Sequence, residues 1–557
     1  MLPEWVKKRH LSLFLSLLFV LGLSLITPLQ LGASVASVLG ESRAVYDISP
    51  SLKDDKEKTI TFDKSVVEPS TGVVYQTATK SFQQYPPLLS ERDLLKENAS
   101  SSRSEKRRSK RHPSQVDTPL NILLLYADDW SFTTLGAMGN NVVKTPRLDD
   151  MAQNGVLFTH NCVTTSICMV SRASLYTGQY ASRHQTFKSY SNLTMYDPGR
   201  WNQTLFPLMK ENGYFTGLVG KYHHHHPPKD VPTFDVFRSS PFRHIWNRSG
   251  IVKHITQWNE DMSMEFLKTR PNGKPFFLTT SFFATHAQDG GPEAYVPMET
   301  SLSLYSNITI PHPSTFTQKH FEGLPDFFQN GKNFGRGRAM KRYFPEDEFQ
   351  HNMKDMYRMA TEVDAASGRL IDELERQGIL NQTLVIFTTD NGNFHGHHGL
   401  AEKWYAFEES LRVPLIVMDP RAPVSTRGTI NDDFTLNIDL APTILSAAKI
   451  PVPESMQGRD ISELYLNRSS IGRKEWRSEF WYEWYGDKKV LPSNLALVRK
   501  DTKYINWLDF GIEQVFDLKH DPFEEHDLYN VTDPATMNEL RTRLSELRHL
   551  AIAGAKL

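Results

Sequence analysis

Short, largely apolar runs recur through the middle of the chain. Ile122–Tyr126, Phe276–Ser281 and Thr383–Thr388 are each five or six residues long and show no alternation of polar and apolar positions. Such runs are typical of strands buried on both faces of a parallel sheet. Between the first two, Thr145-Pro146 provides a helix N-cap followed by proline at the first helical position, and Gly155 closes that helix. The pattern predicts central parallel strands separated by helices.

Two of these runs end in oxygen-bearing side chains. Asp128 and Asp129 follow the first run, and Asp390 and Asn391 follow the last. Open α/β sheets bind ligands at the carboxyl ends of their strands, and adjacent carboxylates repel each other less when a cation lies between them. An all-oxygen set suits Ca²⁺ or Mg²⁺ better than Zn²⁺, and its flexible spacing favours Ca²⁺. A solvent-exposed turn is the alternative interpretation of the first pair.

The extreme N-terminus, residues 1–40, has the pattern of a targeting segment. Lys7, Lys8 and Arg9 precede an apolar run from Leu11 to Ile26. The run is long for a signal-peptide core and slightly short for a membrane span, so a cleaved signal and a type II signal anchor both remain open. Either one predicts a secreted, lysosomal or Golgi-lumenal protein that contacts the membrane only through that anchor.

Glycosylation motifs agree with this route. Eight asparagines stand in N-x-Ser/Thr motifs: Asn98, Asn192, Asn202, Asn247, Asn307, Asn381, Asn467 and Asn530. Residues 41–118 lack periodicity and are rich in Ser, Lys, Glu and Asp, which predicts a disordered stalk or pro-segment. Within it, Arg103–Arg111 is a basic run that is either a processing site or a solvated linker.

Composition narrows the class of protein. The 557 residues are enough for one large domain and a smaller one. Lys and Arg number 63 against 64 Asp and Glu, so nothing in the overall charge indicates a nucleic-acid partner. Cys162 and Cys168 are the two cysteines of the chain, too few for a disulfide framework or a Cys-rich zinc module.

The second cysteine begins the most informative stretch. Cys168-Met-Val-Ser171-Arg172, followed by Thr177-Gly178, resembles the sulfatase signature C-x-P/A-S-R with its later T-G. Further stretches resemble sulfatase motifs in the family's order: Leu125–Asp129, Gly220–His223, Thr285-His286, Thr389–Gly392, Gly396–Trp404, Glu408–Pro414 and Phe516–Glu524. The resemblance extends from about Asn121 to Leu528, and it is greatest to sulfatases that act on polysaccharides and glycosaminoglycans.

The resemblance implies an alkaline-phosphatase-like α/β fold. Its mixed, largely parallel sheet, sandwiched by helices, would occupy a catalytic domain at 119–450. A small C-terminal subdomain at 451–557 would hold an antiparallel sheet, with strands expected at Leu495–Arg499 and Tyr504–Leu508. The segment from Pro534 to Ala551 has apolar residues at helical spacing, which predicts a helix packed against that small sheet.

The resemblance also implies a modified residue and a metal. Cys168 would be oxidised by the formylglycine-generating enzyme, and the hydrated aldehyde would attack the sulfur of a sulfate ester. One Ca²⁺ ion would bind the sulfate and lower the pKa of the attacking hydroxyl. The implied metal ligands are Asp128, Asp129, Asp390, Asn391 and residue 168.

Further catalytic roles follow residue by residue from the matched motifs. Arg172 and Lys221 would hold the aldehyde hydrate, and Lys403 would pair with a sulfate oxygen. His223 would act as the base that expels sulfate, and His286 as the acid at the leaving group. His397 and His398 are expected to line the substrate entrance.

Three alternatives stay open. Val170 stands where the family has Pro or Ala, which leaves an unmodified Cys168 as one alternative. The thiol would then pack as a small hydrophobe or pair with Cys162, and the chain would be a glycan-binding protein with impaired catalysis. A phosphodiesterase of the same superfamily is the enzymatic rival. A sulfated polysaccharide is the expected substrate, and Trp481, Tyr482, Trp484 and Tyr485 form either a sugar-stacking wall or part of the core.

Overall fold

The computed structural model describes residues 118–187, 197–224, 227, 229–466 and 476–556. The expected targeting segment, 1–40, lies outside these residues, and so does the expected stalk except for Thr118. Within the described residues, no helix combines the length and the apolar character needed to cross a membrane.

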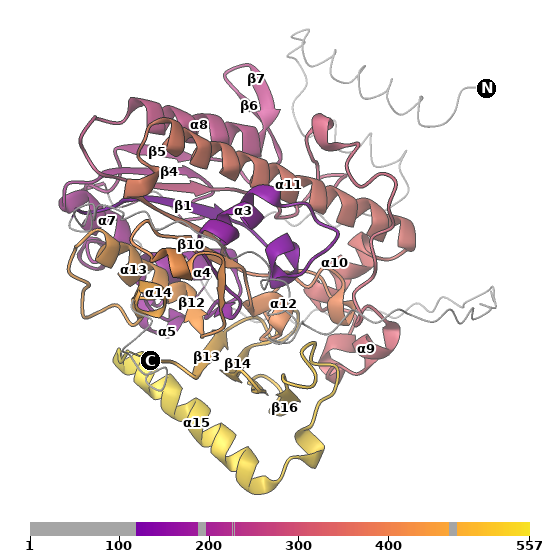
Figure 1. The fold of residues 1–557 in the computed structure, drawn as a ribbon. Coiled ribbons are helices and arrows are strands. Elements are labelled where there is room, and N and C mark those ends of the chain that lie inside the picture. The colour runs from indigo at the N-terminus through magenta and orange to yellow at the C-terminus, as the bar shows by residue number, and fades with distance from the viewer. Residues whose placement is uncertain (1–117, 188–196, 225–226, 228, 467–475, 557) are drawn as a thin grey trace, which may run out of the picture. The chain divides into compact units, whose positions relative to one another are not determined.

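A mixed sheet of eight strands forms the centre of the molecule (Figure 1). Its order is β11-β2-β10-β9-β1-β8-β4-β5. The strands are β1 (Asn121–Ala127), β2 (Val156–Phe158), β4 (Phe215–Gly220), β5 (Val236–Ser239), β8 (Phe276–Ser281), β9 (Thr383–Thr389), β10 (Leu415–Met418) and β11 (Thr429–Asn431). Only β10 runs antiparallel to its neighbours, so the prediction of a mixed, largely parallel sheet is confirmed.

Helices cover both faces of this sheet because its central strands are apolar on both faces. In β1, Leu123 and Leu125 belong to one hydrophobic core, whereas Ile122 and Leu124 belong to the other. Figure 1 shows the two layers of helices on opposite sides of the sheet. The first layer holds α3 (Pro146–Asn154), α8 (Ile255–Thr269) and α11 (Glu346–Arg376), and the second holds α4 (Cys168–Thr177), α7 (Leu205–Glu211) and α13 (Leu440–Ala447).

Local sequence signals account for the ends of these helices. Helix α3 begins at Pro146 and is capped at Gly155, as predicted. Helix α4 begins at Cys168, directly after the extended residue Ile167, and ends at Gly178, whose φ of 63° is the left-handed conformation that glycine adopts easily. The sequence thereby places Cys168 in the first turn of a helix.

Shorter elements connect and border these layers. The short helices are α5 (Ala181–His184), α6 (Pro198–Trp201), α9 (Gln318–Glu322), α10 (Phe334–Arg342), α12 (Glu408–Leu411) and α14 (Glu463–Leu466). Two further strand pairs are parallel β3 (Asn161–Cys162) with β12 (Thr435–Leu436), and the hairpin of β6 (Ile245–Arg248) with β7 (Ile251–His254).

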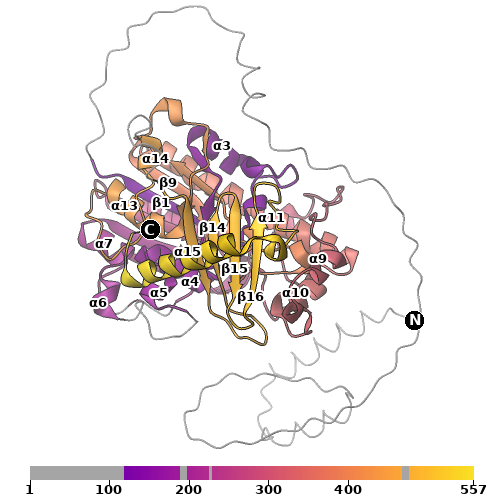
Figure 2. The same ribbon diagram turned by 90° about the horizontal axis from the view of Figure 1, so that it is seen from below.

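A second sheet follows near the C-terminus. It is antiparallel, in the order β13 (Glu479–Trp484), β14 (Asn494–Arg499), β15 (Thr502–Trp507) and β16 (Ile512–Asp517). Helix α15 (Pro534–Ala553) lies across it (Figure 2) and buries residues three or four positions apart: Met537, Leu540, Leu544, Leu547 and Ala551. The predicted antiparallel sheet and its covering helix are confirmed. The domain boundary at residue 450 stays a prediction.

The aromatic cluster of β13 belongs to the core. Trp481 and Tyr482 are completely buried, and Trp484 is 8% exposed. Trp481 contacts Tyr180, and the Tyr482 hydroxyl donates to the carbonyl oxygen of Trp404 at 2.9 Å. These three side chains fasten the second sheet to the rest of the fold, so the interpretation of them as a sugar-stacking wall is wrong. Tyr485, which follows β13, is partly exposed and contacts Phe187, so for this residue the interpretation stays a prediction.

Candidate active site

The predicted metal ligands meet at one edge of the large sheet. Asp128 and Asp129 follow β1, and Asp390 and Asn391 follow its parallel neighbour β9. All four are buried. The backbone N–H of Asp129 donates to Asp390 Oδ1 at 3.3 Å, and Asn391 Nδ2 donates to Asp129 Oδ1 at 2.7 Å. Parallel strands bring residues that are more than 250 positions apart into direct contact here.

The Cys168 side chain points at the two adjacent carboxylates. Its Sγ lies 3.4 Å from Asp128 Oδ1 and 3.8 Å from Asp129 Oδ1. Burial and the Asp128 carboxylate raise the pKa of this thiol well above its ordinary value, because both disfavour the thiolate. Cys162 is also a free thiol, so the alternative of a Cys162–Cys168 disulfide is wrong.

Three buried cations balance the three buried carboxylates. Each cation has a main partner: Lys221 contacts Asp128, Lys403 contacts Asp129, and Arg172 contacts Asp390. Their side chains are at most 2% exposed. Buried charges require such pairing, because removal from water otherwise costs several kcal/mol per ion. The described site is therefore close to neutral.

Arg172 connects three strand ends. Its Nε donates to Asp390 Oδ2 at 2.8 Å, and its Nη1 donates to the carbonyl oxygen of Lys221 at 2.9 Å and to Ser281 Oγ at 2.5 Å. Ser281 Oγ in turn donates to the same Lys221 carbonyl oxygen at 2.7 Å. A guanidinium with donors in a fixed planar fork is suited to this task, and lysine is not.

Close approach of two strands positions Lys221. Gly220, the last residue of β4, has a φ of 105°. A Cβ atom at this position would lie 1.8 Å from the carbonyl oxygen of Ser281 on β8. Any other residue would push the strands apart, so glycine is required for Lys221 to reach Asp128.

The two adjacent aspartates have opposite electrostatic surroundings. Burial and the neighbouring Asp390 carboxylate raise the pKa of Asp128 to about 7. Burial also opposes ionisation of Asp129, but the neighbouring positive groups, led by the Lys403 ammonium, together outweigh it and lower the pKa of Asp129 to about 2. A cation placed between them would favour the ionised form of both.

The two predicted histidines stand at the partly exposed side of the cluster. His286 Nδ1 donates to the carbonyl oxygen of Ala287 at 2.6 Å, which leaves Nε2 facing Asp129 Oδ2 at 3.9 Å. His223 has a φ of 63°, and its buried Nδ1 has no hydrogen-bond partner among the described residues. Burial and the Lys221 ammonium lower the pKa of both imidazoles, so the neutral rings are favoured.

The donor set fits a hard divalent cation. Asn391 Oδ1 is buried and has no hydrogen-bond partner among the described residues, whereas Nδ2 of the same side chain donates to Asp129 Oδ1. Single donor atoms of Asp128, Asp129, Cys168 and His286 lie within 4.8 Å of one another. The carboxylate and amide oxygens are those that Ca²⁺ prefers.

Sequence reasoning missed several polar residues of this site. Ser281 ends a strand that was predicted, and its position at the same sheet edge was the available signal. Glu402 lies 3.6 Å from Lys403 Nζ and also pairs with Arg342 on α10. No local signal identified Arg342, because its contact with Glu402 joins segments about 60 residues apart.

The expectation for the histidine pair is wrong. His397 and His398 are buried, at 8% and 2% exposure. His397 Nδ1 lies 3.0 Å from Glu409 Oε1, and His398 Nε2 lies 3.9 Å from Glu409 Oε2. Pairing with a buried carboxylate, with the Phe523 ring stacked on His397, holds both side chains in the protein interior.

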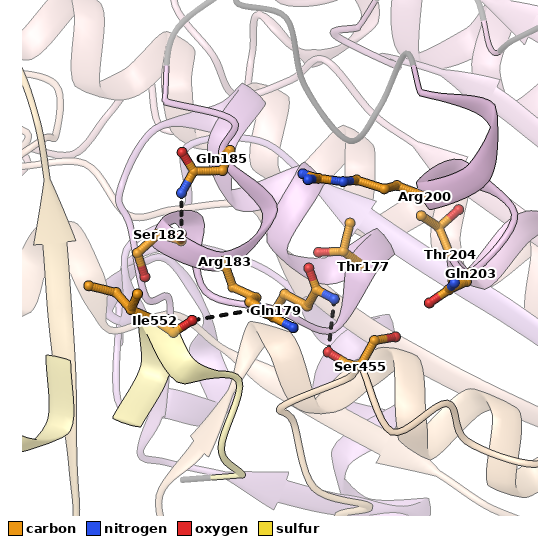
Figure 3. Close-up of a pocket in the computed structure, with 10 residues that line it drawn as sticks. All are labelled: Thr177, Gln179, Ser182, Arg183, Gln185, Arg200, Gln203, Thr204, Ser455 and Ile552. Carbon is orange, nitrogen blue, oxygen red and sulfur yellow. Dashed lines mark hydrogen bonds between the residues drawn. The ribbon is translucent and has the colours of Figure 1, made fainter. Parts of the chain in front are cut away.

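A separate polar cavity of about 370 Å³ lies at the other end of α4 (Figure 3). Thr177, Arg183, Arg200 and Ser455 are among its lining residues. None of the predicted site residues lines it, and Arg183 there donates to the carbonyl oxygen of Ile552 at the end of α15. The cavity is therefore distinct from the cluster around Cys168.

Comparison with known proteins identifies the family. The Sulfatase family model matches residues 120–450, more than half of the chain. The chain belongs to the sulfatase family. A second model, the C-terminal region of N-sulphoglucosamine sulphohydrolase, matches residues 396–550 of this sulfatase. The predictions of the family and of a sulfuric ester hydrolase are thereby confirmed.

Individual relatives agree with this assignment. The sulfatase is 27% identical over 481 residues to an arylsulfatase of Clostridium perfringens, covering 78% of this chain and 93% of the relative. It is 22% identical to an N-acetylglucosamine-6-O-sulfatase of Bacteroides thetaiotaomicron, covering 76% and 85% of the two chains. A structure in complex with its substrate D-glucosamine-2-N,6-O-disulfate aligns with a TM-score of 0.66 at 23% identity, covering 79% and 99%, and supports the fold.

Proposed function

We propose that this sulfatase removes sulfate from a sulfated sugar, with formylglycine formed at position 168 and one bound Ca²⁺. The observation that carries the proposal is the position of Cys168 Sγ, 3.4 Å and 3.8 Å from the carboxylates of Asp128 and Asp129. Three buried cations surround the same point. A structural thiol would have no need of three carboxylates and three cations around it.

Formation of formylglycine would precede folding. Cys168 and Val170 are both 1% exposed, so the maturation enzyme has no access to this segment in the folded protein. Val170 packs with Met169 and Ala181 in a small apolar cluster. This packing suits a valine, and it gives a structural reason for the departure from Pro or Ala at this position.

The chain's own residues would orient the nucleophile and the sulfate. Once formed and hydrated, formylglycine supplies a hydroxyl that attacks sulfur. Lys221 and Arg172 lie around the Asp128 side of residue 168 and would hold this hydroxyl in line with the ester bond. Lys403 lies on the Asp129 side and would pair with a sulfate oxygen.

The charges of the surrounding side chains are compatible with a bound Ca²⁺ ion. The four oxygen-bearing residues Asp128, Asp129, Asp390 and Asn391 would hold Ca²⁺, which supplies Lewis-acid stabilisation of the sulfate oxygens. The three carboxylates and three cations of the protein cancel. A divalent ion would give the site a net positive charge, which suits an anionic sulfate ester.

The two histidines would handle protons at the open side of the site. His286 Nε2 faces the cluster because Nδ1 donates its proton to the Ala287 carbonyl oxygen. The neutral ring therefore has a free lone pair on Nε2, and His286 would first have to take up a proton there, as an imidazolium, to act as the acid at the leaving alcohol. His223 has an unbonded Nδ1 and would accept the proton whose removal releases sulfate.

A sulfated sugar is the proposed substrate class. Two of the similar proteins are an N-acetylglucosamine-6-O-sulfatase and a protein solved with a sulfated glucosamine as its substrate. A secretory route is proposed with it, because every sequon asparagine among the described residues is exposed: Asn202, Asn247, Asn307, Asn381 and Asn530. Digestion with a peptide N-glycosidase should lower the mass of the secreted protein.

The deciding experiment is mass spectrometry of the tryptic peptide from Leu148 to Arg172, from protein made in a eukaryotic secretory pathway. Formylglycine at position 168, with turnover of a sulfated sugar, is the expected result. The Cys168→Ala variant is the control and should be inactive but folded. Plain cysteine with no turnover would favour a glycan-binding protein, and turnover of phosphodiesters alone would favour the phosphodiesterase alternative.

A further inference from the structure

Of the residues assigned to the site, those on one side alone are exposed to solvent. Cys168, Arg172, Lys221, Lys403 and the metal-site residues are buried. The His286 side chain is 16% exposed, and His223 is also partly exposed. A sulfate ester that reaches residue 168 must therefore carry its leaving group out past these two imidazoles.

An exposed aromatic side chain stands beside this opening. Phe242, in the segment between β5 and β6, is 53% exposed. Its ring centroid lies 4.8 Å from that of His223 and 6.1 Å from that of Phe283. Phe283 itself stacks on His286, with centroids 5.2 Å apart and an interplanar angle of 29°. Phe242 and Phe283 thus form an aromatic wall along both catalytic imidazoles.

The wall is also tied to the charged cluster. Lys221 Nζ lies 5.5 Å from the ring centroids of both Phe242 and Phe283. This contact is a cation–π interaction, and it fixes the distance between the wall and the reacting centre. Because Lys221 also contacts Asp128, the same lysine joins Phe242 to the carboxylates around residue 168.

We propose that Phe242 is a stacking platform for the pyranose ring that carries the sulfate group. The proposal rests on the proposed function and assigns a specificity residue to it. Aromatic side chains supply rigid apolar area at ligand sites, and the C–H face of a pyranose is apolar.

Other exposed apolar residues nearby serve as matched controls. Ile251 and Val252 lie on the β6–β7 hairpin, 53% and 60% exposed. Neither is aromatic, so neither can stack on a sugar ring or on the imidazoles of His223 and His286. If the region acted through general surface hydrophobicity, Ile251→Ala would have the same effect as Phe242→Ala.

The test compares Phe242→Ala, Phe242→Trp and Ile251→Ala with the wild type, using glucosamine 6-sulfate and an alkyl sulfate that has no ring. For Phe242→Ala, KM for the sugar sulfate should rise with little change in kcat. Its preference for the sugar over the alkyl ester should fall about three- to ten-fold, the range of one aromatic contact. Phe242→Trp should keep the preference, and so should Ile251→Ala.

Two outcomes would overturn the proposal. One is unchanged kinetics of Phe242→Ala on both esters, and the other is an equal loss on both esters, which would mean that Phe242 only supports His223. Equilibrium binding of glucosamine 6-sulfate to the Cys168→Ala background separates this from failure of the proposed function. If the wild type hydrolyses no sulfated sugar, the catalytic proposal is contradicted. If glucosamine 6-sulfate binds equally well to Cys168→Ala with and without Phe242→Ala, the stacking platform is contradicted.

Discussion

Lys403 Nζ lies 2.5 Å and 2.7 Å from the two carboxylate oxygens of Asp129, across a separation of 274 residues. Both side chains are buried. Burial lowers the pKa of Lys403, but the neighbouring negative groups, Asp129 first, together outweigh it and hold the pKa well above its ordinary value. The charged ammonium is therefore favoured, and the proposed function pairs it with a sulfate oxygen.

Replacement of Lys403 by methionine should abolish most catalysis. The variant keeps the length of the side chain but removes the charge, so we expect kcat to fall about a hundred- to a thousand-fold, as for the loss of one preorganised electrostatic donor. Steady-state assays of a sulfated sugar would measure it. The control is Lys500→Met, at an exposed lysine paired with Asp432. A Lys403→Met enzyme with more than a tenth of wild-type kcat would contradict the proposed role.

Bound Ca²⁺ should raise the thermal stability of the protein as well as support catalysis. A ligand that binds only the folded state adds about 2.7 kcal/mol at a hundred-fold excess over its Kd. Thermal unfolding with EGTA and with added Ca²⁺ would therefore differ in Tm. Asn391→Ala lacks the unpartnered Oδ1, so low Ca²⁺ should shift its Tm less than that of the wild type. Asn330→Ala, at an exposed asparagine, is the control and should show the wild-type Tm shift. An identical Tm in EGTA and in Ca²⁺ would contradict a calcium site.

Glu483 should make stability depend on pH. Burial raises its pKa from 4.5 to about 7, while Oε1 accepts the backbone N–H of Ser182 at 2.8 Å. Because the folded pKa is raised, the folded state binds more protons between these values. The contribution of Glu483 to stability is thus present below pH 4.5 and is lost as pH rises to about 7.

The corresponding measurement is the free energy of unfolding of the wild type and Glu483→Gln across pH 4.5 to 7. The wild type should lose on the order of 3 kcal/mol relative to the variant over that range. Glu454→Gln, at an exposed glutamate, should follow the wild type. Parallel curves for wild type and Glu483→Gln would mean that Glu483 titrates near its ordinary pKa.

Lys503 should be a stability residue and not a catalytic one. Its Nζ, on β15, lies 2.9 Å from Glu408 Oε1 and 2.8 Å from Glu524 Oε1, all buried. Lys503→Met would leave the buried Glu524 without its ion-pair partner and Glu408 with Arg412 alone, at a cost of about 3–5 kcal/mol in unfolding free energy. Urea denaturation would measure it, with Lys489→Met, an exposed lysine, as control. Adding Glu524→Gln should recover part of the loss, and an unaffected Lys503→Met protein would contradict the pairing.

Three of the eight strands of the large sheet were predictable because they carry their own signals. Ile122–Tyr126 and the middle of Thr383–Thr388 are apolar, so both of their faces had to be buried. Their pairing as parallel neighbours places Asp128 and Asp390 together, as the ends of parallel strands require. Helix α3 was equally legible, since Pro146 and Gly155 mark its ends.

Exposure was not predictable from the same patterns. Trp481 and His397 are residue types that serve both in cores and at sugar-binding surfaces, and both are buried here. Phe242 is the reverse case, a residue type typical of cores that is left 53% exposed beside the site. Whether an aromatic ring is covered depends on which distant segment packs on it, and no local spacing records that.

The sequence by itself determined three strands of the large sheet, the oxygen-bearing ends of two of them, helix α3 and, through its motifs, the family. These features are local, because periodicity, caps and short motifs are set by neighbouring residues. Only the tertiary structure decided that Arg172 joins Asp390 to Ser281, that Lys403 neutralises Asp129, and that Arg342 pairs with Glu402. The physical reason is that a buried charge takes its partner from whichever segment the packed sheet and helices bring within hydrogen-bond distance.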